Sequence, residues 1–209
     1  MKTRARWWVW GIVLAISAGG CSGMGKPKER VDHYVLEYEA PDIPDLEPIQ
    51  AVVRLERFSV APQYNTNRIV YRDQEFARET YNYHRWRTNP GDLVTHFLAR
   101  DFRESGLFRA VLPAGSRFSA SCVLEGSVEE FFERDGAEQW EAVLALSVTL
   151  LAEGEPDVSR RVLHQGTYRD SEPCVRKNPR ALSEAMSRAM ARVSRAIIED
   201  VYHFLNQEW

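Results

Sequence analysis

Residues 121–150 read SCVLEGSVEEFFERDGAEQWEAVLALSVTL, and this stretch decides the fold. From Trp140 to Leu150 every second residue is apolar, which is the period of a strand that buries one face. The preceding segment, 121–134, places apolar side chains on one face as well, and Asp135-Gly136 between them favours a tight hairpin turn. A turn at 154–157 precedes a third strand over 160–169. We therefore predict an antiparallel meander with one apolar face.

Two helices are predicted on either side of this meander, each opened by an Asn-Pro pair. Asn89 and Asn178 are typical N-caps, and the proline that follows each fits the first helical position. The first helix ends at Gly106, and the second continues to about Phe204. Each helix has a single apolar stripe. The apolar stripes of the helices and the apolar face of the sheet can bury one another. We therefore predict one two-layer α+β domain over 33–206, in which both helices cover one face of an antiparallel sheet.

The chain before the first helix is predicted to form shorter strands. These are expected at 33–38, 51–61, 69–72 and 76–81, with a proline-rich extended connection over 39–48. The alternation slips by one residue near Arg57, which predicts a bulge or kink there.

Charge divides the 209 residues into two unequal parts. The first 20 contain Lys2, Arg4 and Arg6 and no acid, so the remainder has 24 basic against 30 acidic side chains, a net charge of −6. An acidic body argues against nucleic acid as a partner, because nucleic-acid binding needs a basic surface.

The first 20 residues have the order of a secretory signal peptide. Basic residues come first, an apolar run over 7–18 follows, and small residues come last. The run is shorter than the roughly 20 residues that span a bilayer. An uncleaved membrane helix is the alternative interpretation.

The segment Ala18-Gly19-Gly20-Cys21 resembles a bacterial lipobox, although Ala18 stands where the pattern usually has Leu. The resemblance implies that Cys21 is acylated, palmitate being one of the chains, and becomes the mature N-terminus. Ser22 resembles the residue that directs lipoproteins to the outer membrane. Residues 21–32 are then the acylated cysteine and a flexible tether.

Two cysteines remain, Cys122 and Cys174. In an oxidising periplasm they are candidates for a disulfide. The alternative is two small buried apolar side chains.

No catalytic or metal-binding motif is present in the sequence. The histidines, none at ligand spacing, are His33, His84, His96, His164 and His203. The acids Glu129, Glu130 and Glu133 are interpreted as a solvated strand edge. We predict a protein that is not an enzyme and has no cofactor and no metal, while an enzyme with a diffuse site remains the alternative.

Several segments, taken in order, resemble the ABC-type transport auxiliary lipoprotein (PqiC-like) family. They are Tyr34-Val35-Leu36, 60–64, 68–72, 81–86 with Pro90, 105–108 with Val111, 124–128 with Phe131, and the helix from Ala181. Asn65 and Arg87 depart from the family pattern. The resemblance covers nearly all of residues 33–205.

The resemblance implies an outer-membrane lipoprotein without catalytic activity that faces the periplasm. Implied partners are a periplasmic protein with mammalian-cell-entry (MCE) domains, an inner-membrane permease and an ATPase, and a homo-oligomer is a further implication. Such systems move phospholipids or other hydrophobic molecules between the two membranes. A pilotin-like assembly lipoprotein for another envelope machine is the alternative.

A stretch rich in aromatic and arginine side chains is the candidate partner interface. With two residues of the matched segments, the set is Tyr64, Arg72, Tyr81, Tyr83, Arg85 and Trp86. The alternative is that these large side chains cover the edge of the sheet.

Overall fold

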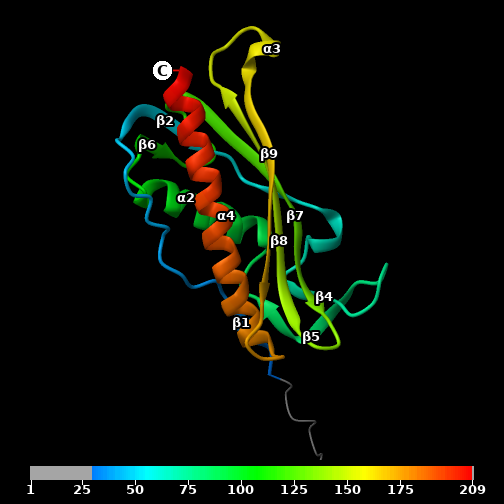
Figure 1. Cartoon of the computed structure of the whole chain (residues 1–209). Coiled ribbons are helices and arrows are strands. Elements are labelled where there is room, and N and C mark those ends of the chain that lie inside the picture. Colours follow the sequence, from blue (N-terminus) through cyan, green and yellow to red (C-terminus); the bar gives the residue numbers. More distant parts are fainter. Residues whose placement is uncertain (1–29, 209) are drawn as a thin grey trace, which may run out of the picture. The chain divides into compact units, whose positions relative to one another are not determined.

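The fold is built on three long antiparallel strands, as predicted. The structure, a computed structural model, describes residues 30–208, so the signal peptide, Cys21 and most of the tether lie outside the described residues. Strands β7 (Cys122–Asp135), β8 (Trp140–Ala152) and β9 (Val162–Pro173) pair in sequence order (Figure 1). The loop 136–139 joins β7 to β8, because Asp135 is the last residue of β7 and pairs with Trp140. The hairpin is as predicted, but the tight turn expected at Asp135-Gly136 is wrong, since neither residue has a positive φ. The predicted meander is confirmed for these strands.

The complete sheet is mixed, so the prediction of a purely antiparallel sheet is wrong. Nine strands in the described part of the chain form one curled sheet. The six others are β1 (Asp32–Tyr34), β2 (Ile49–Leu55), β3 (Ser59–Val60), β4 (Arg68–Arg72), β5 (Glu79–Trp86) and β6 (Phe108–Leu112).

Most of these shorter strands pair in parallel. Strands β2, β3 and β4 each run parallel to β7, β1 runs parallel to β5, and β6 runs parallel to β2, whereas β4 and β5 are antiparallel. Parallel neighbours need a crossover connection, and the segment from β2 to β6 includes a helix. Alternation of apolar residues shows which side chains are buried but carries no information on strand direction.

Three α-helices accompany the sheet in residues 30–208: α2 (Pro90–Glu104), α3 (Val158–Arg161) and α4 (Pro179–Glu208). The cap of α2 is as predicted, since the Asn89 side chain accepts a hydrogen bond from the Gly91 amide. The cap of α4 is also as predicted, with Asn178 Oδ1 accepting from the Ala181 amide at 2.9 Å. Helix α3 is a single turn that includes Arg160 and Arg161, which were expected to begin the third strand, so β9 starts later, at Val162.

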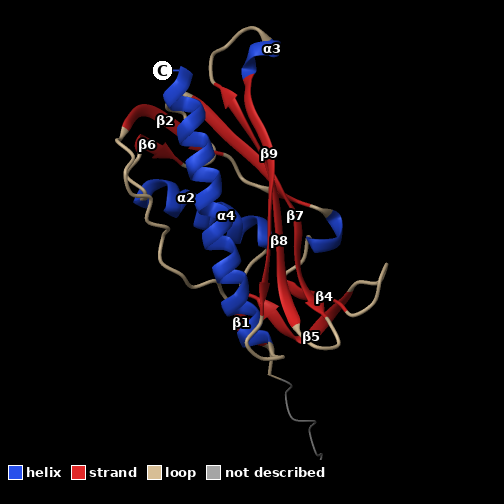
Figure 2. Cartoon of the chain, viewed as in Figure 1, coloured by secondary structure: helices blue, strands red, loops and turns tan. Residues whose placement is uncertain are grey.

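Helix α4 packs along β8 and β9, and α2 contacts β3, β6, β7 and α4 (Figures 1 and 2). The core lies where these elements meet and contains fully buried residues of α2, β7, β8 and α4, among them Phe102, Leu124, Leu146, Met186 and Ile197. Strand β9 contributes partly buried residues only. Ion pairs link α4 to β9 at the surface. Arg192 pairs with Asp170 and Glu172, and Arg188 pairs with Glu172.

The kink predicted near Arg57 separates β2 from β3. There the buried Phe58 ring lies against Gly126 of β7, and a Cβ at position 126 would come within 2.6 Å of that ring. The same Cβ would approach the Ser147 carbonyl oxygen to 2.3 Å. Glycine is therefore required by close approach of the backbone.

The strand predicted over 76–81 begins later, at Glu79. Phe76 has a φ of 62° and belongs to the β4–β5 loop. A side chain in this left-handed region does not continue a strand.

Candidate functional site

The predicted partner interface separates into buried and exposed members. Tyr64 is 1% exposed and stacks on Phe132, with ring centroids 5.7 Å apart. Trp86 is also 1% exposed and meets the Phe131 ring edge-on at 5.1 Å. These two side chains belong to the core, which agrees with the alternative interpretation of the segment and removes them from any exposed surface.

The remaining members lie at the surface of β4 and β5. Tyr83 is 42% exposed, while Tyr81 and Arg85 are partly buried. Arg72 lies over the Phe132 ring at 5.4 Å, and Arg78 lies over the same ring at 5.1 Å. Arg72 lies on the Phe132 side of β7, whereas Tyr81 reaches Glu133 on the opposite side, because neighbouring residues of a strand point to opposite faces. The structure therefore leaves Tyr81, Tyr83 and Arg85 of β5 as partly or fully exposed members and separates Arg72 from Tyr81.

A buried carboxyl group, that of Glu133, contacts Tyr81 and was misassigned from sequence. Glu133 is fully buried, although a solvated edge was predicted for it. The Tyr81 hydroxyl donates to Glu133 Oε1 at 2.9 Å, and Glu133 Oε2 has no hydrogen-bond partner among residues 30–208. Glu133 is two residues from Phe131, so both side chains point to the same face of β7. That spacing is the signal that identifies the burial.

Burial raises the pKa of Glu133 to about 7, and nearby Asp135 adds to the increase, although the hydrogen bond from Tyr81 opposes it. Burial and the proximity of Glu133 in turn raise the pKa of the Tyr81 hydroxyl. A carboxyl group that titrates near neutral pH is a feature of many active sites. Here, however, its partner is a tyrosine whose pKa is raised, so Tyr81 acts as a hydrogen-bond donor that stays protonated.

Of the two alternatives for Cys122 and Cys174, a disulfide or two small buried side chains, the structure has the second, because both thiols are free and buried. Cys122 is opposite Ala152 at the end of β8, whereas the Cys174 amide donates to the carbonyl of Trp140 at its beginning. The 12 residue steps of β8 between these partners correspond to about 40 Å of strand, against a bridging limit of about 7 Å between Cα atoms. Burial raises the pKa of both thiols to about 12, so neither is a reactive thiolate near neutral pH.

His84, His164 and His96 have separate surroundings. His84 contacts the Tyr34 hydroxyl through Nδ1 at 3.2 Å, and His164 contacts the Tyr168 hydroxyl at 3.1 Å. His96 is exposed on α2. Within residues 30–208 no group of three or more His, Cys, Asp or Glu side chains is placed to hold a metal ion.

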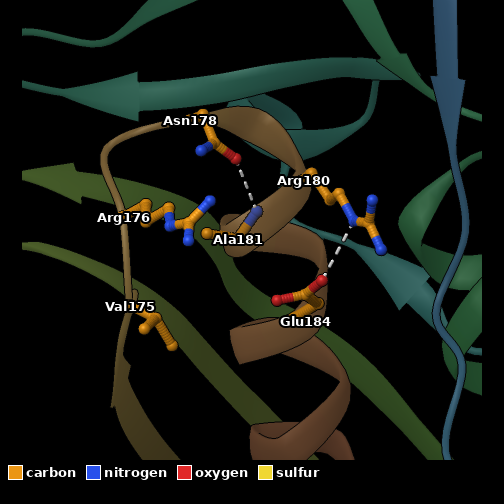
Figure 3. Close-up of a pocket in the computed structure, with 6 residues that line it drawn as sticks. All are labelled: Val175, Arg176, Asn178, Arg180, Ala181 and Glu184. Carbon is orange, nitrogen blue, oxygen red and sulfur yellow. Dashed lines mark hydrogen bonds and ion pairs between the residues drawn. The ribbon is translucent and has the colours of Figure 1, made fainter.

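An open hollow of about 380 Å³ lies at the N-terminal end of α4 (Figure 3). Its lining residues are Val175, Arg176, Asn178, Arg180, Ala181 and Glu184. Arg180 forms an ion pair with Glu184 at 3.1 Å, and the side-chain oxygen of Asn178 caps the helix. The single carboxylate of the hollow is thus paired with a cation. The hollow has the character of a polar surface rather than of a catalytic centre.

The same α+β fold occurs in solved structures of three proteins. Protein XCC0632 from Xanthomonas campestris, of the family DUF330, superposes with a TM-score of 0.77 at 18% identity, over 85% of this chain and 98% of its own. An uncharacterised protein gives 0.63 at 13% identity, over 83% and 99%. Protein CT253 from Chlamydia trachomatis gives 0.55 at 11% identity, over 75% and 98%. At these identities the likeness concerns the fold alone.

The family itself is shown by the sequence. Residues 34–198 match the family described as "ABC-type transport auxiliary lipoprotein component", and the chain belongs to this family. No curated protein matches the chain. The family resemblance stated from the sequence motifs is therefore confirmed. The class of protein is that of auxiliary lipoprotein components of ABC-type transport. Across the described residues, no helix is long and apolar enough to cross a membrane.

Proposed function

We propose that this protein is an outer-membrane lipoprotein without catalytic activity that docks the periplasmic conduit of an ABC transport system. The conduit is an MCE-domain protein, served by an inner-membrane permease and an ATPase, and the cargo is phospholipid or another hydrophobic molecule. The observation that carries the proposal is the family match over 34–198, which follows the lipobox-like segment ending at Cys21, with residues 22–33 between them.

Acylation of Cys21 gives the domain its place in the envelope. Each buried methylene contributes about 0.8 kcal/mol, and one acyl chain alone binds only marginally. The two or three chains of a processed lipoprotein hold the protein permanently on the membrane surface. Such an anchor suits a docking protein, which must stay in place while its partner spans the periplasm.

The contact with the conduit is proposed at the exposed residues of β4 and β5. Tyr83 and Arg85 of β5 combine an aromatic ring with a guanidinium group, a combination common in interface hot spots. Arg72 of β4 is a second, separate candidate, since it lies over Phe132. Glu133 is held by Tyr81, so its role in this account is structural.

Affinity purification from membranes tests the proposal. The full-length protein carries a C-terminal tag, and the envelope is solubilised in mild detergent before purification. We expect an MCE-domain protein to co-purify, together with the permease and the ATPase. A Cys21→Ala variant controls for anchoring, and we expect it to lose the complex because it is not acylated.

Two results contradict the proposal. One is intact, membrane-anchored lipoprotein with no MCE-domain protein. The other is recovery of a secretin in place of the transport proteins, which would support the pilotin-like role.

A further inference from the structure

The tether joins the domain beside the first turns of α4. Strand β1 follows the tether, and Val35 is the first residue after β1. The carbonyl oxygen of Val35 accepts a hydrogen bond from the Ser183 hydroxyl of α4. The Glu37 amide donates to the Ser187 hydroxyl at 3.0 Å, one turn further along the helix. The N-terminal part of α4 and the point where the chain enters the domain are therefore neighbours (Figure 1).

At the start of α4, the loop that joins it to β9 forms what we call the tether-side surface, residues 175–180. Its sequence, VRKNPR, contains three cations and no acid. Val175 is 75% exposed, and Figure 3 shows Val175 and Arg176 side by side on the loop before the helix. Lys177 Nζ donates to the carbonyls of Gly136 and Ala137, which holds the loop against the β7–β8 turn.

The charge of this surface contrasts with the rest of the molecule. Everything after the first 20 residues has a net charge of −6, whereas residues 175–180 contain three cations, of which Arg180 pairs with Glu184. The tether has the same character, since Lys26, Lys28 and Arg30 outnumber its one acid over 22–31, Glu29. Arg176 has no ion-pair partner within the described part of the chain, so its charge is available to a ligand outside the protein.

We propose that the tether-side surface lies on the headgroups of the membrane that holds the acylated Cys21, so that the domain stands on its α4 N-terminal end. This inference rests on the lipid anchor of the proposed function. Basic side chains are attracted to an anionic membrane surface, and an exposed apolar side chain gains from partial burial at the interface.

The length of the tether supports this orientation. Ten residues, 22–31, separate Cys21 from β1, and a fully extended chain of that length reaches at most about 36 Å. Strand β9, with 12 residues, is itself about 40 Å long. The tether-side surface follows one end of β9, and α3 precedes the other end. The end with the tether is held near the membrane, and the α3 end points away from it.

Two exposed valines at opposite ends of β9 make a matched test. Val175 is 75% exposed and Val158, in α3, is 76% exposed. Each is replaced separately, as Val175→Cys and Val158→Cys, in the full-length acylated protein and labelled with the environment-sensitive fluorophore NBD. The unsubstituted protein, labelled in the same way, is the control for any background labelling of the buried Cys122 and Cys174. The labelled proteins are reconstituted in vesicles of phosphatidylethanolamine with a minor share of phosphatidylglycerol.

We expect the probe at 175 to shift its emission to shorter wavelength and to lose intensity when the lipids carry a shallow spin-label quencher, while the probe at 158 does neither. The shift at 175 should be smaller in vesicles of phosphatidylcholine alone. A response at both positions, which would place the domain on its side, overturns the proposal, as does a response at neither. Shielding of position 175 only after partner proteins are added overturns it in favour of a protein contact. None of these outcomes alters the co-purification experiment, so the two proposals fail separately.

Discussion

At the scale of single residues, Glu133 is the least expected feature of this domain. Its carboxyl group is fully buried, one oxygen accepts from Tyr81, and the other oxygen has no partner among residues 30–208. A buried carboxylate without full hydrogen bonding is costly, and protonation relieves that cost. Protonation of this one residue therefore links folding stability to pH near neutrality.

We predict that stability falls as pH rises from about 5 to 8, and that Glu133→Gln removes this fall. The folded protein keeps the proton up to the pKa of about 7, whereas the unfolded chain releases it at the ordinary value of 4.5. The stabilisation is therefore complete below pH 4.5 and is lost as pH rises through 7. At about 1.4 kcal/mol per unit, the loss is on the order of 3 kcal/mol.

Urea unfolding of residues 31–209 at several pH values measures this effect. Glu125→Gln, at an exposed position of the same strand, is the control and should keep the pH dependence of the wild type. An unchanged slope in Glu133→Gln would assign the pH dependence to another group.

Truncation of the buried aromatic residue of β5 should lower stability far more than truncation of the exposed one. Trp86→Ala removes a core side chain that contacts Phe131 and should cost about 3–5 kcal/mol of stability. Tyr83→Ala should stay within about 0.5 kcal/mol, as exposed substitutions do. Thermal unfolding of both variants checks the pair. Equal losses would mean that Tyr83 is as much a part of the core as Trp86.

At the scale of elements, local signals predicted the helices and the long strands, whereas the pairing of the short strands required the tertiary structure. Asn-Pro pairs placed the starts of α2 and α4, and Asp135-Gly136 indicated the β7–β8 hairpin, although its loop is 136–139 and Asp135 belongs to the strand. The parallel pairing of β2 and β6 depends on contacts between distant segments. The same holds for the candidate site, because sequence identified an aromatic and basic segment but not the burial of Tyr64 and Trp86.

The cap of α4 is expected to contribute measurably to stability. Asn178→Ala removes the acceptor of the Ala181 amide and should lower stability by about 1 kcal/mol. Asn178→Asp should keep most of the stabilisation that the cap provides, because aspartate is an equally good cap. Urea midpoints of the two variants provide the measurement. A full loss in the aspartate variant would show that the cap is not what the asparagine supplies.

Gly126 is expected to tolerate no side chain. In Gly126→Ala the new Cβ would meet the Ser147 carbonyl and the Phe58 ring, so we expect a loss of about 1–3 kcal/mol from overpacking. The double variant with Phe58→Leu should recover part of that loss, because the smaller side chain yields space. A double variant whose losses simply add would show that Phe58 is not the obstacle, and denaturant unfolding distinguishes the two results.

At the scale of the whole molecule, the domain is held together without covalent bridges in residues 30–208. Cys122 and Cys174 are free and lie at opposite ends of the sheet. The sequence suggested a bridge only because an even number of thiols remained, and the spacing of cysteines along a chain does not show their separation in space. Stability therefore depends on the core between the sheet and α4, and on the ion pairs of α4 with β9.

The central claim is that this lipoprotein docks an MCE-domain conduit, and photo-crosslinking in living cells tests it most directly. A photo-reactive phenylalanine replaces Tyr83 on the proposed interface or, in a second strain, Phe118, which is 77% exposed in the β6–β7 loop. Our account predicts that illumination links position 83 to an MCE-domain protein, and that position 118 gives less of this product. Adducts with a secretin, or no adduct with an MCE-domain protein from either position while the lipoprotein is intact in the outer membrane, would contradict it.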